Sequence, residues 1–321
     1  MNRIQQIAVA ACFIAPLACG GEPDRTIAGV LNASHGSSFS EWSEPVSLDA
    51  SLNTSFNDQQ PALTKDGLTL YFASNRPLSP GAPLHNEIWV AHRECLECPF
   101  GPPVNLGAPV NTPGNDAAPV LSRDEHWLFI LTDRPGGIGS ADIWAAYRED
   151  VHDDFGWQAP VNLGAGVNGS GFDGGAAFFE NEGGGAQLFF NKSPLPTPGG
   201  GDIYVSTQNP DGSWGVAIPV DEVNTPLTDQ RPSISHNGLD IYFFSNREGG
   251  QGGVDIWGAT REDVAAPFGT PTNLGAGINT AAAEQHPFIY GKGGTQQLYF
   301  SRNLGTGTVL NLDLFVSTRE R

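Results

Sequence analysis

Five acidic side chains are the groups in this 321-residue chain whose types and spacing could do chemistry. They recur once in each of five similar segments, as Asp58, Asp116, Asp173, Asp229 and Glu284. A base follows each acid after 18 or 19 residues, as Arg76, Arg134, Lys192, Arg247 and Arg302. Glycoside hydrolysis requires two such carboxylates, one as acid and one as nucleophile or base. A ring of carboxylates could also bind a hard cation such as Ca²⁺ through oxygen ligands.

Recurrence in every segment favours a structural role for these acids. A catalytic acid and base need different pKa values, so they are expected at positions that differ between segments. A carboxylate that every segment needs is better explained by capping loop amides or by pairing with an arginine. A second set of acids opens the third strand of each segment and is expected to pair with the same bases: Glu87, Asp142, Asp202, Asp255 and Asp313. No catalytic residue is therefore assigned, and ligand or metal binding by the first set stays an alternative.

Positions that differ between segments are better candidates for specificity. The residue two places after each acid is, in turn, Gln60, Ala118, Gly175, Arg231 and His286. If a ligand binds at the end of the segments where the five acids lie, Gln60, Arg231 and His286 are the candidate specificity residues. The alternative is neutral surface variation at these positions. The seven His residues show no metal-ligand spacing. We therefore predict no metal site and no cofactor other than the Ca²⁺ alternative.

The elements that carry these residues form a repeat. An aromatic residue followed by a stretch similar to Pro-Val-Asn-Leu-Gly recurs every 54 to 58 residues, at Trp42, Phe100, Trp157, Trp214 and Phe268. Each unit has a first strand, a tight turn such as Lys65-Asp66-Gly67, an alternating second strand and a third strand after a Gly-rich loop. The aromatic stretch supplies a fourth, outer strand. Five such units predict an all-β, five-bladed β-propeller with four antiparallel strands per blade.

The two ends of the repeat are expected to complete one blade together. The repeat begins on an outer strand, residues 44–48, and ends on a third strand, residues 312–318. Pairing them would close the ring and remove its open edges. Aromatic residues recur in the third strands and are expected to pack between blades: Trp89, Trp144, Tyr204, Trp257 and Phe315.

Composition and charge limit the partners. The 41 Gly and 25 Pro residues favour tight turns and short strands over helices. The formal charge of −19 argues against nucleic acid, because binding to phosphates depends on Lys and Arg. Anionic lipid surfaces are disfavoured for the same reason. A protein, peptide or glycan partner stays open, and we expect a monomer.

The N-terminus predicts export. An apolar run over residues 7–18 is too short to span a bilayer but suits a signal peptide. The following Cys19 predicts lipidation and anchoring at the outer membrane, with ordinary cleavage and a periplasmic or secreted protein as the alternative. The predicted organisation is a signal peptide over residues 1–19, a tether over 20–41 and the propeller over 42–321. Cys95 and Cys98, the cysteines beyond this signal, are expected to form a disulfide.

The recurring Asp-x-x-Pro-x-Leu-Ser, Tyr-Phe-x-Ser-Asn-Arg and Asp-Ile-Trp motifs resemble the TolB-type, WD40-like propeller repeats of bacterial envelope proteins. Blade three departs most, with Ala176 in place of Pro and Lys192 in place of Arg. The resemblance implies an envelope location and a binding or scaffold role. The primary prediction is therefore a non-enzymatic module that presents one loop face to its partner. The alternative is a glycan hydrolase or lyase similar to five-bladed arabinanases, with carboxylates at the channel mouth.

Overall fold

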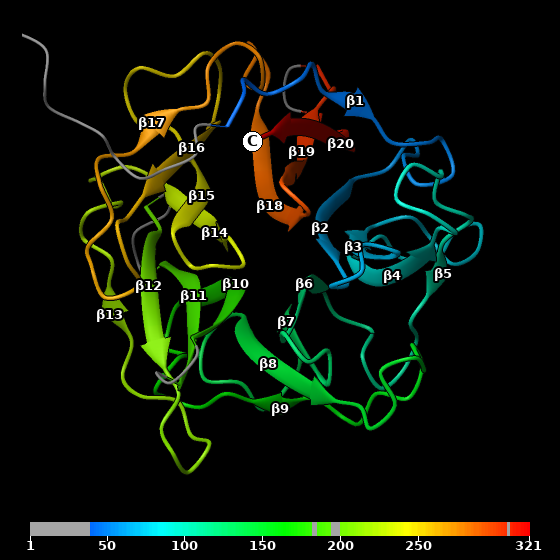
Figure 1. Cartoon of the computed structure of the whole chain (residues 1–321). Coiled ribbons are helices and arrows are strands. Elements are labelled where there is room, and N and C mark those ends of the chain that lie inside the picture. The colour runs from blue at the N-terminus through cyan, green and yellow to red at the C-terminus, as the bar shows by residue number, and fades with distance from the viewer. Residues whose placement is uncertain (1–38, 182–184, 194–199, 307–308) are drawn as a thin grey trace, which may run out of the picture. The chain divides into compact units, whose positions relative to one another are not determined.

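The computed structural model describes residues 39–181, 185–193, 200–306 and 309–321. Five four-stranded antiparallel sheets surround a central axis in this part of the chain (Figure 1), which confirms the predicted five-bladed, all-β propeller. All twenty regular elements of the described residues are strands, and none is a helix that could cross a membrane. The predicted signal peptide, Cys19 and most of the tether lie outside the described residues, so export and lipidation stay predictions.

Each blade runs from an inner strand beside the axis to a short outer strand. Blade one contains β2 (Asp58–Leu63), β3 (Thr69–Ser74), β4 (Glu87–His92) and β5 (Val104–Asn105). Blade two contains β6 (Asp116–Leu121), β7 (Trp127–Thr132), β8 (Asp142–Tyr147) and β9 (Val161–Asn162). Blade three contains β10 (Phe172–Asn181), β11 (Gly185–Ser193), β12 (Asp202–Thr207) and β13 (Ile218–Pro219). Blade four contains β14 (Asp229–Ile234), β15 (Asp240–Ser245), β16 (Asp255–Thr260) and β17 (Thr272–Asn273).

Blade five joins the two ends of the repeat, as predicted. It contains β18 (Glu284–Lys292), β19 (Thr295–Asn303), β20 (Leu312–Glu320) and, as its outer strand, β1 (Val46–Ser47). Val46 lies opposite Val316, and the backbone amide of Leu48 donates to the carbonyl of Leu314 at 2.9 Å. The N-terminal strand therefore covers the edge that β20 would otherwise expose.

A recurring asparagine fastens each blade to the loop that leaves it. Asn111 accepts a hydrogen bond from the Ile88 amide at 2.8 Å and donates to the Ile88 carbonyl at 2.9 Å. The same two bonds recur in the other blades, through Asn53, Asn168, Asn224 and Asn279. Because one side chain satisfies both polar groups of a buried backbone position, the residue is needed in every unit.

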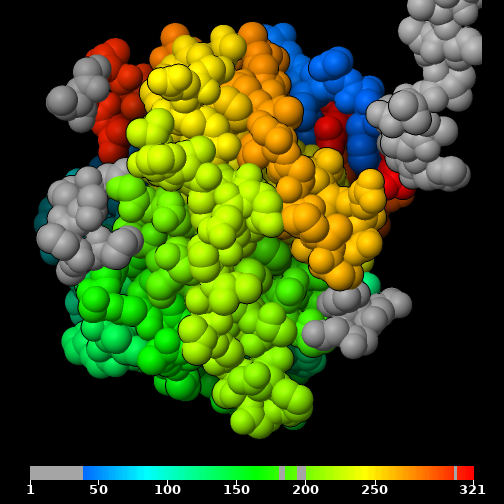
Figure 2. Space-filling view, turned by 90° about the vertical axis from the view of Figure 1, so that its left-hand side faces the viewer, coloured from blue at the N-terminus to red at the C-terminus, as the bar shows by residue number. Residues whose placement is uncertain are grey.

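The core lies between neighbouring blades. Blades three and four share a cluster that includes Phe179, Ile203, Ile241 and Phe243, none more than 5% exposed. Burying each such side chain contributes about 1.5–3 kcal/mol. Figure 2 shows the green and yellow surfaces of these blades in contact along the side of the propeller. Each blade therefore depends on its neighbours for burial of its apolar faces.

The third-strand aromatics contribute to this packing and also stack against the Arg and Lys side chains that follow the second strands. Trp257 and Phe315 are buried, whereas Trp89, Trp144 and Tyr204 are half-buried. The guanidinium carbon of Arg76 lies 5.1 Å from the centroid of the Trp89 ring, and Arg247 lies 5.2 Å from Trp257. Such stacking holds each base in place by cation–π attraction.

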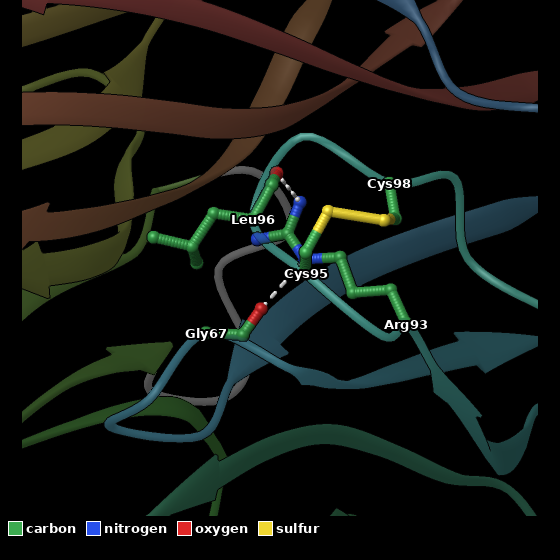
Figure 3. The surroundings of a disulfide bond; sticks show 5 residues. All are labelled: Gly67, Arg93, Cys95, Leu96 and Cys98. Carbon is green, nitrogen blue, oxygen red and sulfur yellow. Dashed lines mark hydrogen bonds between the residues drawn. A yellow bond between two sulfur atoms is a disulfide. The ribbon is translucent and has the colours of Figure 1, made fainter.

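Cys95 and Cys98 form a disulfide within the loop between β4 and β5 (Figure 3). Arg93 fixes this loop against the first hairpin turn of the blade. Its guanidinium donates to the Gly67 carbonyl and to the Leu96 carbonyl, both at 2.7 Å. The disulfide therefore stabilises a turn that packs beside the β2–β3 hairpin.

Candidate functional site

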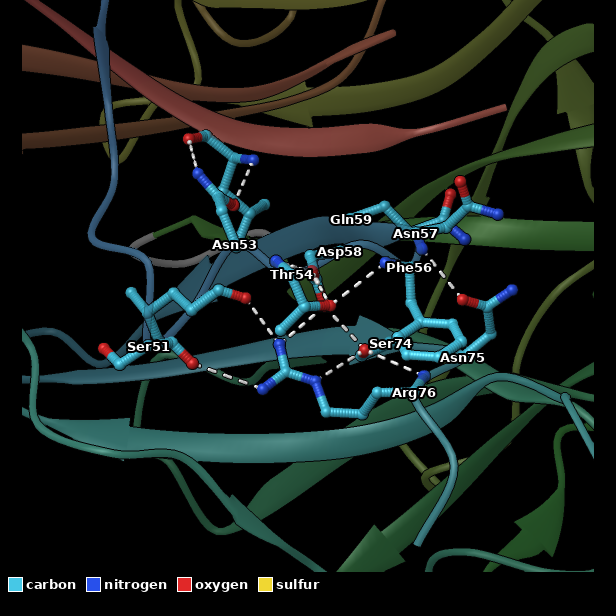
Figure 4. A network of polar contacts seen from close by, with 12 residues as sticks. Ser51, Asn53, Thr54, Phe56, Asn57, Asp58, Gln59, Ser74, Asn75 and Arg76 are labelled. Carbon is cyan, nitrogen blue, oxygen red and sulfur yellow. Dashed lines mark hydrogen bonds and ion pairs between the residues drawn. The ribbon is translucent and has the colours of Figure 1, made fainter. Parts of the chain in front are cut away.

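The five first-strand acids are structural ion pairs in this fold. In blade one, the Oδ2 atom of Asp58 accepts hydrogen bonds from the amide and hydroxyl of Thr54, at 2.6 and 2.8 Å. Its Oδ1 atom accepts from Ser74 and from Arg76, both at 2.6 Å (Figure 4). Asp58 is fully buried. Both oxygens are thus occupied by donors, which leaves no free position for a substrate or a metal ion.

The other blades repeat this arrangement. The acid–base distances are 2.9 Å for Asp116–Arg134, 2.7 Å for Asp173–Lys192 and 2.8 Å for Glu284–Arg302, and Asp229 pairs with Arg247. None of the five carboxylates lines either cavity described below. No group of three or more His, Cys, Asp or Glu side chains among the described residues could hold a metal ion. The five acids therefore form buried ion pairs and line neither cavity, although the residue after the acid lines one of them, the loop-face cavity, at Gln59, Ala117 and Gln285.

The acids that open the third strands have different partners from those predicted. Asp142 accepts from the Gly139 amide at 3.0 Å and from Asn162 at 2.9 Å. Asp255 accepts from Asn273 at 2.8 Å, which is the same contact two blades later. No ion pair joins this set to the second-strand bases in the part of the chain that the structure describes. The predicted pairing is wrong because each base is already held by the first-strand acid.

The predicted specificity positions lie in a bulge of each inner strand. The register between first and second strands shifts at this point in all five blades. The bulged residues have left-handed φ angles of 51–62°, although only one is glycine: Gln60, Ala118, Gly175, Arg231 and His286. A left-handed φ at a non-glycine residue costs of order 1–3 kcal/mol and persists only where the surrounding structure imposes it. The bulge turns these five residues toward the propeller axis.

Two cavities of about 390 Å³ each lie along that axis. The turn-face cavity is lined by the inner strands and by the hairpin turns between first and second strands, including Lys65, Arg123 and His236. The loop-face cavity opens at the other end, among loop residues such as Asn86 and Asp133. Gln60, Arg231 and His286 line both cavities. The three candidate specificity residues therefore lie where the two cavities meet.

Arg231 is the cation at this junction. Its side chain is half-buried and packs at 5.9 Å over the ring of Phe172. Its Nη1 atom is buried without a hydrogen-bond partner. Burial lowers the pKa of Arg231 to about 10, which leaves the guanidinium charged at neutral pH.

His286 and Asn191 add two further polar atoms without partners. The Nδ1 atom of His286 and the Nδ2 atom of Asn191 are both buried and make no hydrogen bond. Burial and the nearby charge of Arg231 hold the pKa of His286 well below its ordinary value, so the imidazole is neutral at pH 7. The Oδ1 atom of Asn191 accepts from the Arg231 amide at 3.4 Å. His286 lines both cavities, whereas Asn191 is fully buried behind the Arg231 backbone and lines neither.

Sequence reasoning missed two carboxylates on the turn-face cavity, Glu125 and Glu180. Glu125 has a φ of 63° at the turn position that is glycine in blades one and four, Gly67 and Gly238. Its Oε1 atom accepts from the backbone amide of Lys65 in the neighbouring blade at 2.5 Å. The replacement of a turn glycine by a glutamate was the available signal, because a non-glycine residue in this conformation is uncommon.

Solved glycoside hydrolases have a similar fold. An α-L-arabinofuranosidase from Podospora anserina in complex with cellotriose is 11% identical with a TM-score of 0.56, covering 88% of this chain and 97% of that one. An α-L-arabinofuranosidase from Lactobacillus brevis is 10% identical with a TM-score of 0.56, covering 82% and 90%. A thermostable family-43 glycoside hydrolase is 13% identical with a TM-score of 0.57, covering 83% and 90%. No protein-family model and no curated protein matches the sequence.

These comparisons correct the functional prediction. The similar structures are glycoside hydrolases and not specifically TolB-type or WD40-like propellers, so that resemblance holds at the level of the five-bladed propeller. The primary prediction of a non-enzymatic binding or scaffold module is contradicted, as is the expectation that the chain is not an enzyme. The comparisons favour the alternative prediction, a glycan hydrolase. At 10–13% identity the likeness itself shows the fold, and the activity is a proposal.

Proposed function

We propose that this chain hydrolyses glycosidic bonds and binds its glycan in the turn-face cavity. The proposal rests on two carboxylates that line this cavity, Glu125 and Glu180. Glycoside hydrolysis uses two carboxylates on either side of the scissile bond. The loop-face cavity has Asp133 as its one lining carboxylate among the described residues. The turn-face cavity therefore suits this reaction better.

The walls of the turn-face cavity also suit a sugar. Phe178 and Phe288 are half-buried and line it, so part of each ring is accessible. The apolar face of a sugar ring can pack on such an aromatic surface. A volume of about 390 Å³ is in the range of small-molecule sites and accommodates a short segment of a glycan.

The contacts of the two carboxylates suggest their roles. Glu125 accepts a backbone hydrogen bond at 2.5 Å, an arrangement that suits the nucleophile or base. Glu180 is exposed at the cavity wall, where it could donate a proton to the leaving oxygen. The roles assigned here use residues of blades two and three, which satisfies the expectation that acid and base differ between blades.

Hydrolysis assays test this proposal. The protein is incubated with aryl glycosides and with neutral and acidic polysaccharides, and released sugar is measured. We expect hydrolysis of at least one substrate, and a fall in kcat of about 10²-fold or more in Glu125→Gln and in Glu180→Gln. Asp133→Asn, a carboxylate of the other cavity, is the matched control and should retain its rate. Absence of hydrolysis across the panel, or full activity in both glutamine variants, would overturn the proposal.

A further inference from the structure

In the part of the chain that the structure describes, the Arg231 side chain has neither the carboxylate partner of Arg134 and Arg148 nor the backbone carbonyl partner of Arg93 and Arg261. Arg148, which is fully buried, pairs with Asp154 at 3.2 Å, and Arg134 pairs with Asp116 at 2.9 Å. Among the described residues, no carboxylate lies within ion-pair distance of Arg231, and its Nη1 atom donates to nothing. A charged group in a low-dielectric site is costly without a counter-charge. The site is therefore electrostatically incomplete in the isolated chain.

Two polar residues lie beside Arg231. Asn191 accepts from the Arg231 amide through its Oδ1 atom and is fully buried, so it holds the Arg231 backbone and lines neither cavity. The unpartnered Nδ1 atom of His286 can carry the proton of the neutral imidazole. These atoms come from β11 and β18, on either side of β14. Arg231 and His286 line both cavities, and a cation beside a polar group with donor capacity is suited to an anion.

Gly175 makes room for the Arg231 side chain. A Cβ atom at this position would lie 2.3 Å from Cδ and 3.2 Å from Nε of Arg231. The backbone itself does not require glycine, because Ala118 adopts the equivalent left-handed conformation in blade two. The glycine is therefore explained by the space that Arg231 occupies, together with Asn191, whose Oδ1 atom would lie 2.8 Å from the same Cβ.

The turn-face cavity is also positive at its rim. Lys65, Arg123 and Lys292 line it together with Arg231, against the two carboxylates Glu125 and Glu180. These four cations gather on one cavity of a chain that has only 16 basic residues and a net charge of −19. The local excess of positive charge favours an anionic ligand over a neutral one.

We infer that Arg231, beside His286, binds the carboxylate of an acidic sugar that enters through the turn-face cavity. The planar guanidinium matches a carboxylate geometrically. The half-buried Phe178 and Phe288 rings then face the sugar ring. The choice of a sugar as carrier of the carboxylate rests on the proposed function, whereas the anion site itself rests on Arg231, which lines both cavities without a carboxylate partner among the described residues, and on the basic residues around the turn-face cavity.

Calorimetric titration tests the inference without depending on hydrolysis. The wild-type chain is titrated with digalacturonate, with the neutral analogue digalactose and with acetate. We expect digalacturonate to bind at least about tenfold more tightly than digalactose, because its carboxylate can form a charge-assisted hydrogen bond with Arg231 that the neutral sugar cannot form. Tighter binding of digalacturonate than of acetate assigns the carboxylate to a sugar. Equal affinity for digalacturonate and digalactose, or for digalacturonate and acetate, would overturn the inference.

Two variants connect the binding to Arg231. Arg231→Gln should reduce digalacturonate affinity about tenfold or more, and its backbone is tolerated because Gln60 occupies the equivalent position in blade one. Gly175→Ala, which displaces the Arg231 side chain, should have the same effect. Gln230→Ala, next to Arg231 but not on the turn-face cavity, is the control. Unchanged affinity in a folded Arg231→Gln protein would contradict the inference even if the protein hydrolyses glycans. Conversely, binding of digalacturonate without hydrolysis would support the anion site and contradict only the proposed function.

Discussion

The Asp58 carboxylate illustrates how a side chain with catalytic potential is used for structure. Its two oxygens accept from Thr54, Ser74 and Arg76, and the residue is fully buried. A general acid or base must exchange a proton with substrate, which requires access and a free lone pair. Asp58 has neither. At the axis the situation is reversed, since Arg231 and His286 face cavities and retain atoms without partners.

His286 should make the stability of the propeller depend on pH. Its pKa in the folded state is well below 6.5, so the unfolded chain takes up a proton that the folded chain excludes. Stability is therefore fully present above about pH 6.5 and falls as the pH is lowered toward the folded-state pKa, by up to about 1.4 kcal/mol per pH unit. We expect His286→Gln to lose less stability than the wild type between pH 7 and pH 5.5 in urea unfolding.

Gln60 makes this substitution a fair comparison, because glutamine adopts the same left-handed conformation in blade one. The groups that face His286 are Arg231 from β14 and the Phe244 ring from β15, whose centroid is 5.7 Å from that of the imidazole. The Arg231 charge does not change over this pH range, since the pKa of Arg231 is about 10. An identical loss of stability in both proteins would show that His286 is not the titrating group.

At the scale of the element, the inner strand explains both the positions of the cavities and their lining. Each inner strand is an edge strand that faces the axis, and its bulge is followed by proline in four blades: Pro61, Pro119, Pro232 and Pro287. Proline has no backbone donor, so it suits an edge and discourages further pairing. The bulge before it directs one side chain per blade to the axis. Variation at this position therefore changes the ligand site without changing the blade.

The strands could be predicted because each signal occurs five times in register. The alternation that predicts a second strand in one unit is supported by four others, and the observed β3, β7, β11, β15 and β19 contain it. The ion pairs could not be predicted, because Ser74 lies opposite both Asp58 and Glu87 and the sequence does not show which acid Arg76 selects. The bulge was missed for a similar reason, since a residue before proline is ordinarily extended.

The closing strand β1 should be needed for stability. Trp42 packs in the cluster shared by blades four and five, and Arg319 lies 4.4 Å from its ring centroid. We expect a chain that begins at residue 49 to be at least about 3 kcal/mol less stable than one that begins at residue 39, because it loses this burial and the β1–β20 hydrogen bonds. Thermal unfolding measures the difference. Equal melting temperatures would rule out a role of β1 in closing the ring.

On the scale of the whole molecule, charge is distributed unevenly. The chain carries 35 acidic and 16 basic residues, and the turn-face cavity collects four of the bases. The first-strand ion pairs use five more bases, one in each blade. The rest of the molecule is therefore strongly negative. Mutual repulsion among its surface carboxylates opposes the compact state, whereas the buried pairs are screened little by salt.

Salt should therefore stabilise the propeller. We expect the melting temperature to rise by about 2 °C or more when NaCl is increased from 10 to 150 mM, since screening weakens the repulsion of a −19 chain. Anion binding at Arg231 would raise it too, because a ligand of the folded state adds stability. Arg231→Gln separates the two causes, since it removes the anion site and leaves the surface carboxylates in place. If the melting temperature of Arg231→Gln also rises with NaCl, general screening is supported. If the rise disappears in the variant, or is absent from both proteins, general screening is contradicted.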